Sequence, residues 1–210
     1  IDELSITSWP DWRFETQTAG EALKRHFAVQ SLAAFGVDGL ATLKVDSAIA
    51  SVLGTGRTVL DGTGRLIVPG ILYDPQHDRS DAMVAVMNRD GSTRRAFSDD
   101  GWTALDIGRS DVFSAAAALP YGGGILVVGG TADALNRDWL RTPGSLVAAV
   151  YRRDGTLDPS FGDGGRVLTP ITRGAGYAVA MAVITDVATY TVAGTGGGDG
   201  IVARFRLAPE

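Results

Sequence analysis

The residues best suited to acid–base chemistry lie in one short polar stretch, residues 74–79. Here His77 stands beside the carboxylates of Asp74 and Asp78, and imidazole is the side chain that titrates near neutral pH. Such a group beside a carboxylate defines a candidate general base for a lyase or hydrolase. A histidine in a surface loop is the simpler interpretation, and the other histidine, His26, is expected to be structural at the start of a strand.

Aromatic side chains form a second candidate site. Trp12 and Trp139 each follow an aspartate, in segments that we expect to be long loops. Variable loops on a rigid scaffold are where binding residues concentrate, and exposed tryptophans there suit a sugar, a peptide or another subunit. Packing inside the fold is the alternative. The candidate binding residues are Trp9, Trp12, His77, Asp78, Asp138 and Trp139.

No metal, cofactor or catalytic residue is assigned. The chain has no cysteine and no His-x-x-x-His pair, so thiolate and zincin-type sites are not expected. The glycine clusters at 54–58 and 194–200 lack the Gly-Lys-Ser/Thr ending of a phosphate-binding loop and are read as turns. Asx turns, rather than calcium, account for a set of turn aspartates: Asp90, Asp99, Asp100, Asp154, Asp158 and Asp163.

Composition narrows the classes of protein further. The 210 residues carry a net charge of −5, with 28 glycines and 45% hydrophobic residues. This charge lacks the basic footprint of a nucleic-acid-binding protein, and no apolar run approaches the ~20 residues needed to cross a bilayer. The chain begins at Ile1 rather than methionine, which suggests processing and the earlier removal of any signal peptide.

Three sequence landmarks recur about every 60–64 residues. An apolar strand ends in glycine at Gly70, Gly130 and Gly194. An alternating strand runs into an Asp-Gly turn at Asp90 and again at Asp154. A phenylalanine precedes a glycine by four residues, at Phe35, Phe97 and Phe161. Landmarks that keep step along the whole chain predict a tandem structural repeat.

Each repeat is predicted to contain four strands, A to D, because Asp-Gly between alternating strands is a strong hairpin signal. Small residues in strand A, such as the alanines at 115–118, suit a crowded innermost strand. Short strands repeated radially at this spacing are typical of a β-propeller, so the fold class is all-β with propeller blades. One repeat array spans residues 1–210, in units at about 1–46 (B, C and D only), 47–107, 108–170 and 171–210 (A, B and C only).

The segment at 147–165 resembles the delta-sixty repeat family of bacterial secreted proteins. It has a strand ending in Val150-Tyr151, the turn Asp154-Gly155, and the stretch Leu157-Asp158-Pro159-Ser160-Phe161-Gly162. The second unit matches this pattern less well, since Ser98-Asp99-Asp100 replaces the glycine-rich turn. The resemblance implies propeller blades and an extracytoplasmic, bacterial location. It implies no activity.

One stretch conflicts with the repeat. Residues 19–35 contain good helix formers at helical spacing, whereas the repeat predicts a strand at 27–32. We favour the strand, because tertiary context overrides weak local propensity, with a short helix at 19–25 before it.

These patterns predict a non-catalytic binding or scaffold module with an unidentified carbohydrate or peptide ligand. A lyase or hydrolase that uses His77 is one alternative, and a structural subunit joined through sheet edges is another. The incomplete first and last units favour pairing with a protein partner, or with further blades of the same propeller, through terminal strands that include Val202 and Phe205.

Overall fold

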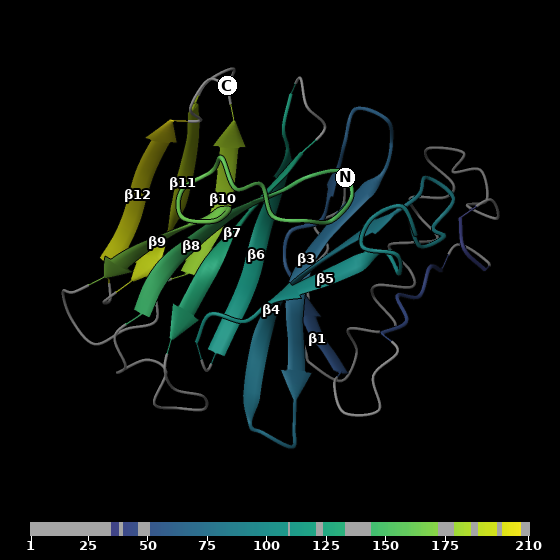
Figure 1. Cartoon of the computed structure of the whole chain (residues 1–210), viewed down its shortest axis with the longest axis horizontal. Coiled ribbons are helices and arrows are strands. Elements are labelled where there is room, and N and C mark those ends of the chain that lie inside the picture. Colours follow the sequence, from purple (N-terminus) through teal and green to yellow (C-terminus); the bar gives the residue numbers. More distant parts are fainter. Residues whose placement is uncertain are drawn as a thin grey trace, which may run out of the picture. The chain divides into compact units, whose positions relative to one another are not determined.

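The computed structural model of the chain (Figure 1) describes residues 35–37, 40–45, 51–108, 110–120, 124–132, 144–171, 179–185, 189–196 and 199–206. The chain divides into two compact units, Ile1–Leu40 and Ala41–Glu210. Every regular element among the described residues is a β-strand, and all of them belong to the second unit. The expectation of an all-β protein is therefore confirmed.

The first five strands form an antiparallel arrangement that we call group I. They are β1 (Ser51–Thr55), β2 (Val59–Leu60), β3 (Leu66–Asp74), β4 (Arg79–Met87) and β5 (Trp102–Leu105). β1 and β2 both pair with β3 and together act as one interrupted strand at its side. β4 pairs with β3 on one side and with β5 on the other.

The next seven strands form two further antiparallel groups. Group II contains β6 (Ser110–Ala118), β7 (Ile125–Ala132), β8 (Gly144–Tyr151) and β9 (Arg166–Ile171), paired in chain order. Group III contains β10 (Val179–Thr185), β11 (Thr189–Gly196) and β12 (Asp199–Arg206) and is a separate sheet. Each strand follows its predecessor in space because short turns join antiparallel neighbours.

Groups I and II share few backbone hydrogen bonds. A single parallel pair, Ser80 with Ser110, links β4 to β6 and makes the two groups one nine-stranded sheet by hydrogen bonding. Close to the start of β2, the N–H of Arg57 donates to the carbonyl of Ser114 (2.8 Å). Gly56 precedes it, and a Cβ there would lie 2.5 Å from that carbonyl oxygen. The glycine cluster at 54–58 thus includes a residue required by close contact between strands.

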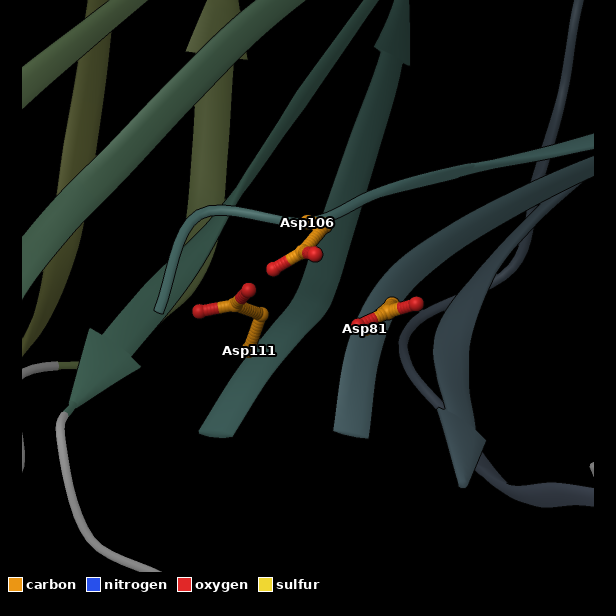
Figure 2. A group of neighbouring side chains, drawn as sticks. All are labelled: Asp81, Asp106 and Asp111. Carbon is orange, nitrogen blue, oxygen red and sulfur yellow. The ribbon is translucent and has the colours of Figure 1, made fainter. Parts of the chain in front are cut away.

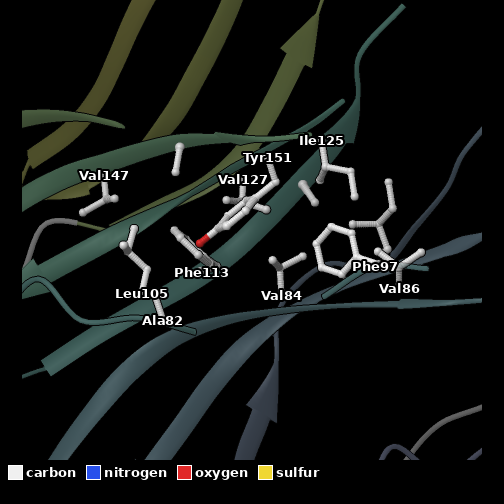
Figure 3. Packing of buried hydrophobic residues seen from close by; sticks show 13 residues of the cluster. Ala82, Val84, Val86, Phe97, Leu105, Phe113, Ile125, Val127, Val147 and Tyr151 are labelled. Carbon is white, nitrogen blue, oxygen red and sulfur yellow. The ribbon is translucent and has the colours of Figure 1, made fainter. Parts of the chain in front are cut away.

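Side chains packed between groups I and II form the larger hydrophobic core (Figure 3). Alternation along each strand sends every second side chain to this interface. Tyr151 of β8 lies at its centre, with its ring 6.3 Å from the rings of both Phe97 and Phe113. The buried members are Ile67, Ala82, Val84, Val86, Phe97, Leu105, Phe113, Ala116, Ile125, Val127, Val147, Ala149 and Tyr151.

The opposite face of group II forms a second core with group III. All eight residues of β7 are buried, and neighbouring side chains point to different cores: Val127 to group I, Leu126 and Val128 to group III. Tyr190 and Val192 supply the group III side of this second core. The ring of Tyr190 lies 5.7 Å from Phe161 and stacks on Phe205 at 5.1 Å. Group II is therefore a middle layer.

Backbone hydrogen bonds after β4 recur after β8 at a spacing of 64 residues. Gly101 donates to Phe97 (2.7 Å) as Gly165 donates to Phe161 (2.9 Å). Three more bonds correspond in the same way: Val86 to Gly101 with Val150 to Gly165, Arg94 to Val86 with Asp158 to Val150, and Asn88 to Ser92 with Arg152 to Thr156. The Asp-Gly turns were expected in equivalent positions, and these bonds give them the same backbone course.

The strand pairing corrects one landmark of the sequence. Gly70 pairs with Met83, and the residue that pairs with Val147, 64 positions later, is Gly129 rather than Gly130. Gly194 pairs in the same way with Ile201. Each of these glycines lies beside a register shift in the preceding strand. At Gly129 a Cβ would lie 1.8 Å from the carbonyl oxygen of Val112, so this bulge admits no side chain.

The three landmark phenylalanines are not equally buried. Phe97 and Phe161 are buried, whereas Phe35 is only partly buried. The turn after Phe35 still resembles the turn after Phe161, because Val37 bridges to Leu40 as Asp163 bridges to Arg166. Equivalent burial is therefore wrong for Phe35, which packs less completely than the other two. The helix and strand expected within 19–34 lie outside the described residues, in which no helix is long and apolar enough to cross a membrane.

Candidate functional site

His77 lies in a tight turn and not in the long loop expected at 71–81. β3 continues to Asp74 and β4 begins at Arg79, so only residues 75–78 connect the two strands. The Nδ1 of His77 lies 2.6 Å from Oδ2 of Asp74, and the His77 side chain is 66% exposed. Asp74 also accepts the N–H of Gln76 (2.9 Å). The hydrogen bond from His77 lowers the pKa of Asp74, and this pair caps the hairpin.

Asp78 occupies the same turn in a left-handed conformation, with φ of 48°. Its Oδ1 accepts the Tyr73 hydroxyl at 3.3 Å. Trp9, Trp12, Asp138 and Trp139 lie outside the described residues. Of the predicted binding residues, the structure therefore places two, in a single turn. His77 and the Asp90-Gly91 turn lie at opposite ends of β4, as predicted.

Three carboxylates meet near the end of the strands that carries His77 (Figure 2). Asp81 belongs to β4, Asp106 to the loop after β5, and Asp111 to β6. One oxygen of each lies within 4.8 Å of the others. The site is thus built where groups I and II join through Ser80 and Ser110.

Asp111 is fully buried and rich in hydrogen bonds. Its Oδ2 accepts the N–H groups of Ile107 (2.7 Å) and Gly108 (3.0 Å), and its Oδ1 accepts the Thr131 hydroxyl. Burial raises the pKa of Asp111, and these hydrogen bonds offset only part of that rise. Asp111 therefore holds the β5–β6 loop against β7.

Asp81 is less well satisfied. Its Oδ1 is buried and has no hydrogen-bond partner, while its Oδ2 lies 3.7 Å from Arg79. Burial raises the pKa of Asp81; Arg79 opposes this, and Asp106 and Asp111 add to it. Arg79 also donates to Asp106 at 3.1 Å. Like charges gathered at partial burial make this cluster the most electrostatically strained group among the described residues.

Two kinds of chemistry fit the aspartate cluster. Carboxylate oxygens are the ligands that calcium prefers, but Arg79 already supplies a positive charge and Asp111 already has hydrogen-bond donors. An internal network that ties two groups of strands together accounts for the same contacts. The sequence gives no signal for this cluster, because Asp81 and Asp106 are far apart in the chain and meet only through packing.

The turn aspartates serve the backbone, as expected. Asp90 accepts the N–H and hydroxyl of Ser92 (2.9 and 2.6 Å), and Asp154 accepts those of Thr156 (2.9 and 2.7 Å). These hydrogen bonds, led by the hydroxyl in each case, lower the pKa of both aspartates. Both are Asx turns of the kind that the sequence predicts.

A cleft lies at the other end of the strands, between groups I and II. Its volume is about 270 Å³. Arg65, Arg94, Arg153 and Asp61 supply its charged groups, and Phe97 with Ile125 supplies part of its apolar wall. The sequence analysis did not select these residues. The available signal was Arg94, which stands where the second unit has Asp158, 64 residues later.

Comparison with known proteins adds no relative: no family model matches the chain, and no curated protein or solved structure matches it significantly.

Proposed function

We propose that this chain is a non-catalytic binding module made of β-propeller blades, with groups I and II as complete blades and group III as part of a third. The observation that carries the proposal is β7, whose side chains are buried on both faces. Antiparallel sheets stacked face to face, each adding about four strands, are the arrangement of a propeller. The recurring hydrogen bonds at a spacing of 64 residues support the tandem repeat.

The contacts of His77 favour binding over catalysis. A catalytic base needs several polar groups converging on a pocket, whereas His77 is mostly exposed and hydrogen-bonded to the hairpin residue Asp74. The carboxylates with raised pKa values, Asp81 and Asp111, are held by Arg79 and by Thr131 respectively. A bacterial, extracytoplasmic location follows from the resemblance to the delta-sixty repeat family and is part of the proposal.

An array of carbohydrates and peptides tests this function. The full chain should retain a ligand and release it chemically unchanged, and the His77→Ala variant should retain it equally. Turnover of a retained ligand that stops in His77→Ala would identify the lyase or hydrolase instead and overturn the proposal.

A structural assembly role is the second candidate, favoured by β12. This strand pairs only with β11 among the described residues, and Val202 on it is 73% exposed. Phe205, expected to lie at the same edge, instead stacks on Tyr190 inside the second core. An unpaired edge with an exposed β-branched residue invites strand addition. Sedimentation should then show an assembly that Val202→Lys dissociates; a wild-type monomer would exclude it.

A further inference from the structure

The cleft between groups I and II combines a cationic rim with an apolar floor. Its rim comes from four separate segments: the β2–β3 turn, the residues after β4, the β6–β7 connection and the residues after β8. Its volume of about 270 Å³ lies at the lower end for ligand pockets, which suits a small ligand.

The charges of the rim do not balance. Asp61 is paired with Arg65 and also accepts the N–H and hydroxyl of Thr63. Burial would raise the pKa of Asp61, but the hydrogen bonds from Thr63 and Arg65 outweigh it and lower the pKa to about 2. Asp61 therefore neutralises Arg65 at neutral pH. Arg94 and Arg153 are left with no ion pair among the described residues, in a chain whose net charge is −5.

Arg94 is the better placed of these two arginines. It is partly buried, and its Nε is buried without a hydrogen-bond acceptor. Nearly all buried N–H donors in folded proteins are paired, and a guanidinium is the side chain best shaped to bind a carboxylate through two parallel hydrogen bonds.

The fold does not need an arginine at position 94. Asp158 occupies the corresponding place after β8, where it accepts the N–H of Ser160 (3.1 Å) and a hydrogen bond from Arg152 (3.2 Å). The backbone bond to the preceding strand is the same at both positions, since Arg94 donates to Val86 (3.0 Å) and Asp158 to Val150 (2.8 Å). A turn that forms with either residue leaves the guanidinium of Arg94 available to a ligand.

The floor of the cleft is apolar. Ile67, Val86, Phe97 and Ile125 line it and belong to the larger core, and Figure 3 shows Val86, Phe97 and Ile125 close together at one end of that core. Water against such a surface is readily displaced by an apolar group.

We infer that this cleft binds a small organic carboxylate that carries one apolar group. The carboxylate contacts Arg94 and Arg153, and the apolar group lies against Phe97 and Ile125. The site lies at the opposite end of the strands from His77, and the inference rests on the cleft's own residues rather than on the function proposed above.

Benzoate is the probe for this inference, with benzamide and inorganic phosphate as matched comparisons. Titrations of the full chain, followed by amide chemical shifts, should show saturable binding of benzoate near residues 94 and 125. Benzamide lacks the charge and phosphate lacks the apolar group, so each should bind at least tenfold more weakly. Equal binding of either compound, or no saturable binding of benzoate, would overturn the inference and leave the proposed glycan or peptide binding untouched.

Two neighbouring arginines provide the control. Arg94→Gln should weaken benzoate binding by roughly tenfold to 100-fold, the loss of a charged hydrogen bond. Arg95→Gln should not change it, because Arg95 is exposed and does not line the cleft. If Arg94→Gln fails to fold, the exposed Arg153→Gln replaces it with the same expectation. Equal effects at 94 and 95, or no effect at the cleft arginines, would contradict the inference.

Discussion

The segments after β4 and after β8, residues 87–101 and 151–165, follow nearly the same hydrogen-bonded course with different side chains. Asp158 caps its own turn in the second segment, while Arg94 at the same place in the first lines a cleft. Gly162 has φ of 58° in the second segment, and Ser98 takes φ of 54° in the first. The comparison teaches that the backbone tolerates a change of residue here, so that one segment can serve the fold and the other can serve a ligand.

Position 151 tests the comparison most strongly. Tyr151 is buried between Phe97 and Phe113, whereas Met87 holds the corresponding place after β4. Tyr151→Ala should destabilise the protein by about 3–5 kcal/mol, through lost burial and the cavity that remains. Tyr151→Phe should be neutral or stabilising, because the Tyr151 hydroxyl is buried without a partner. Urea unfolding measures both, and a large loss in Tyr151→Phe would mean that the hydroxyl is bonded.

A glycine common to the three groups is the next test. Gly129→Ala should cost about 1–3 kcal/mol, since its Cβ would overlap the carbonyl of Val112 and displace β6. Gly62→Ala is the control, because nothing lies within 4 Å of a Cβ at that turn position. Thermal melting of the two variants should separate them clearly, and equal melting temperatures would remove the bulge from the account.

Exchange of the left-handed residues sharpens the comparison of the two turns. Ser98→Gly should stabilise by up to about 1 kcal/mol, because a serine with positive φ is strained. Gly162→Ser should destabilise, since its Cβ would lie 2.2 Å from the carbonyl oxygen of Arg166. Denaturant midpoints of both variants check this, and the same sign for both substitutions would show that the turns are not equivalent.

Acid unfolding should distinguish the two ends of the strands by a smaller effect. The pKa of Asp61 falls from 3.8 to about 2 on folding, so its contribution to stability is present above pH 4 and is lost as the pH falls towards 2. The pKa of Asp81 is raised, so its contribution has the opposite sign and stability declines as Asp81 ionises. Asp61→Asn should therefore flatten the acid limb of stability against pH, and Asp81→Asn should gain most at neutral pH. The reverse pattern in pH-dependent melting would contradict both assignments.

The strands and turns could be predicted because their signals are local. Alternating apolar residues at 83–87 and 147–151, each followed by Asp-Gly, specify a strand and a hairpin turn without help from the rest of the chain. The strand register could not be fixed in the same way. Gly129 and Gly130 are adjacent and both end an apolar strand, and only the pairing with Val147 selects Gly129.

The sites depended on packing and were harder to predict. Residues 71–81 read as a loop because Pro75, Gln76, His77 and Asp78 are polar or turn-forming, yet cross-strand pairing extends β3 and β4 to within four residues of each other. Asp81 and Asp111 meet only where β4 and β6 are joined. Arg94 was visible as a departure from the repeat, but its place in a cleft depends on Asp61 and Ile125 from other turns.

A crystal structure of the full chain tests the central claim most directly, namely that groups of strands stack face to face with group II between its neighbours. The account predicts Val127 packed against group I, and Leu126 with Val128 packed against Tyr190 and Val192 of group III. A structure in which β10–β12 extend the sheet edge to edge beyond β9, leaving Leu126 and Val128 exposed to solvent, would contradict it.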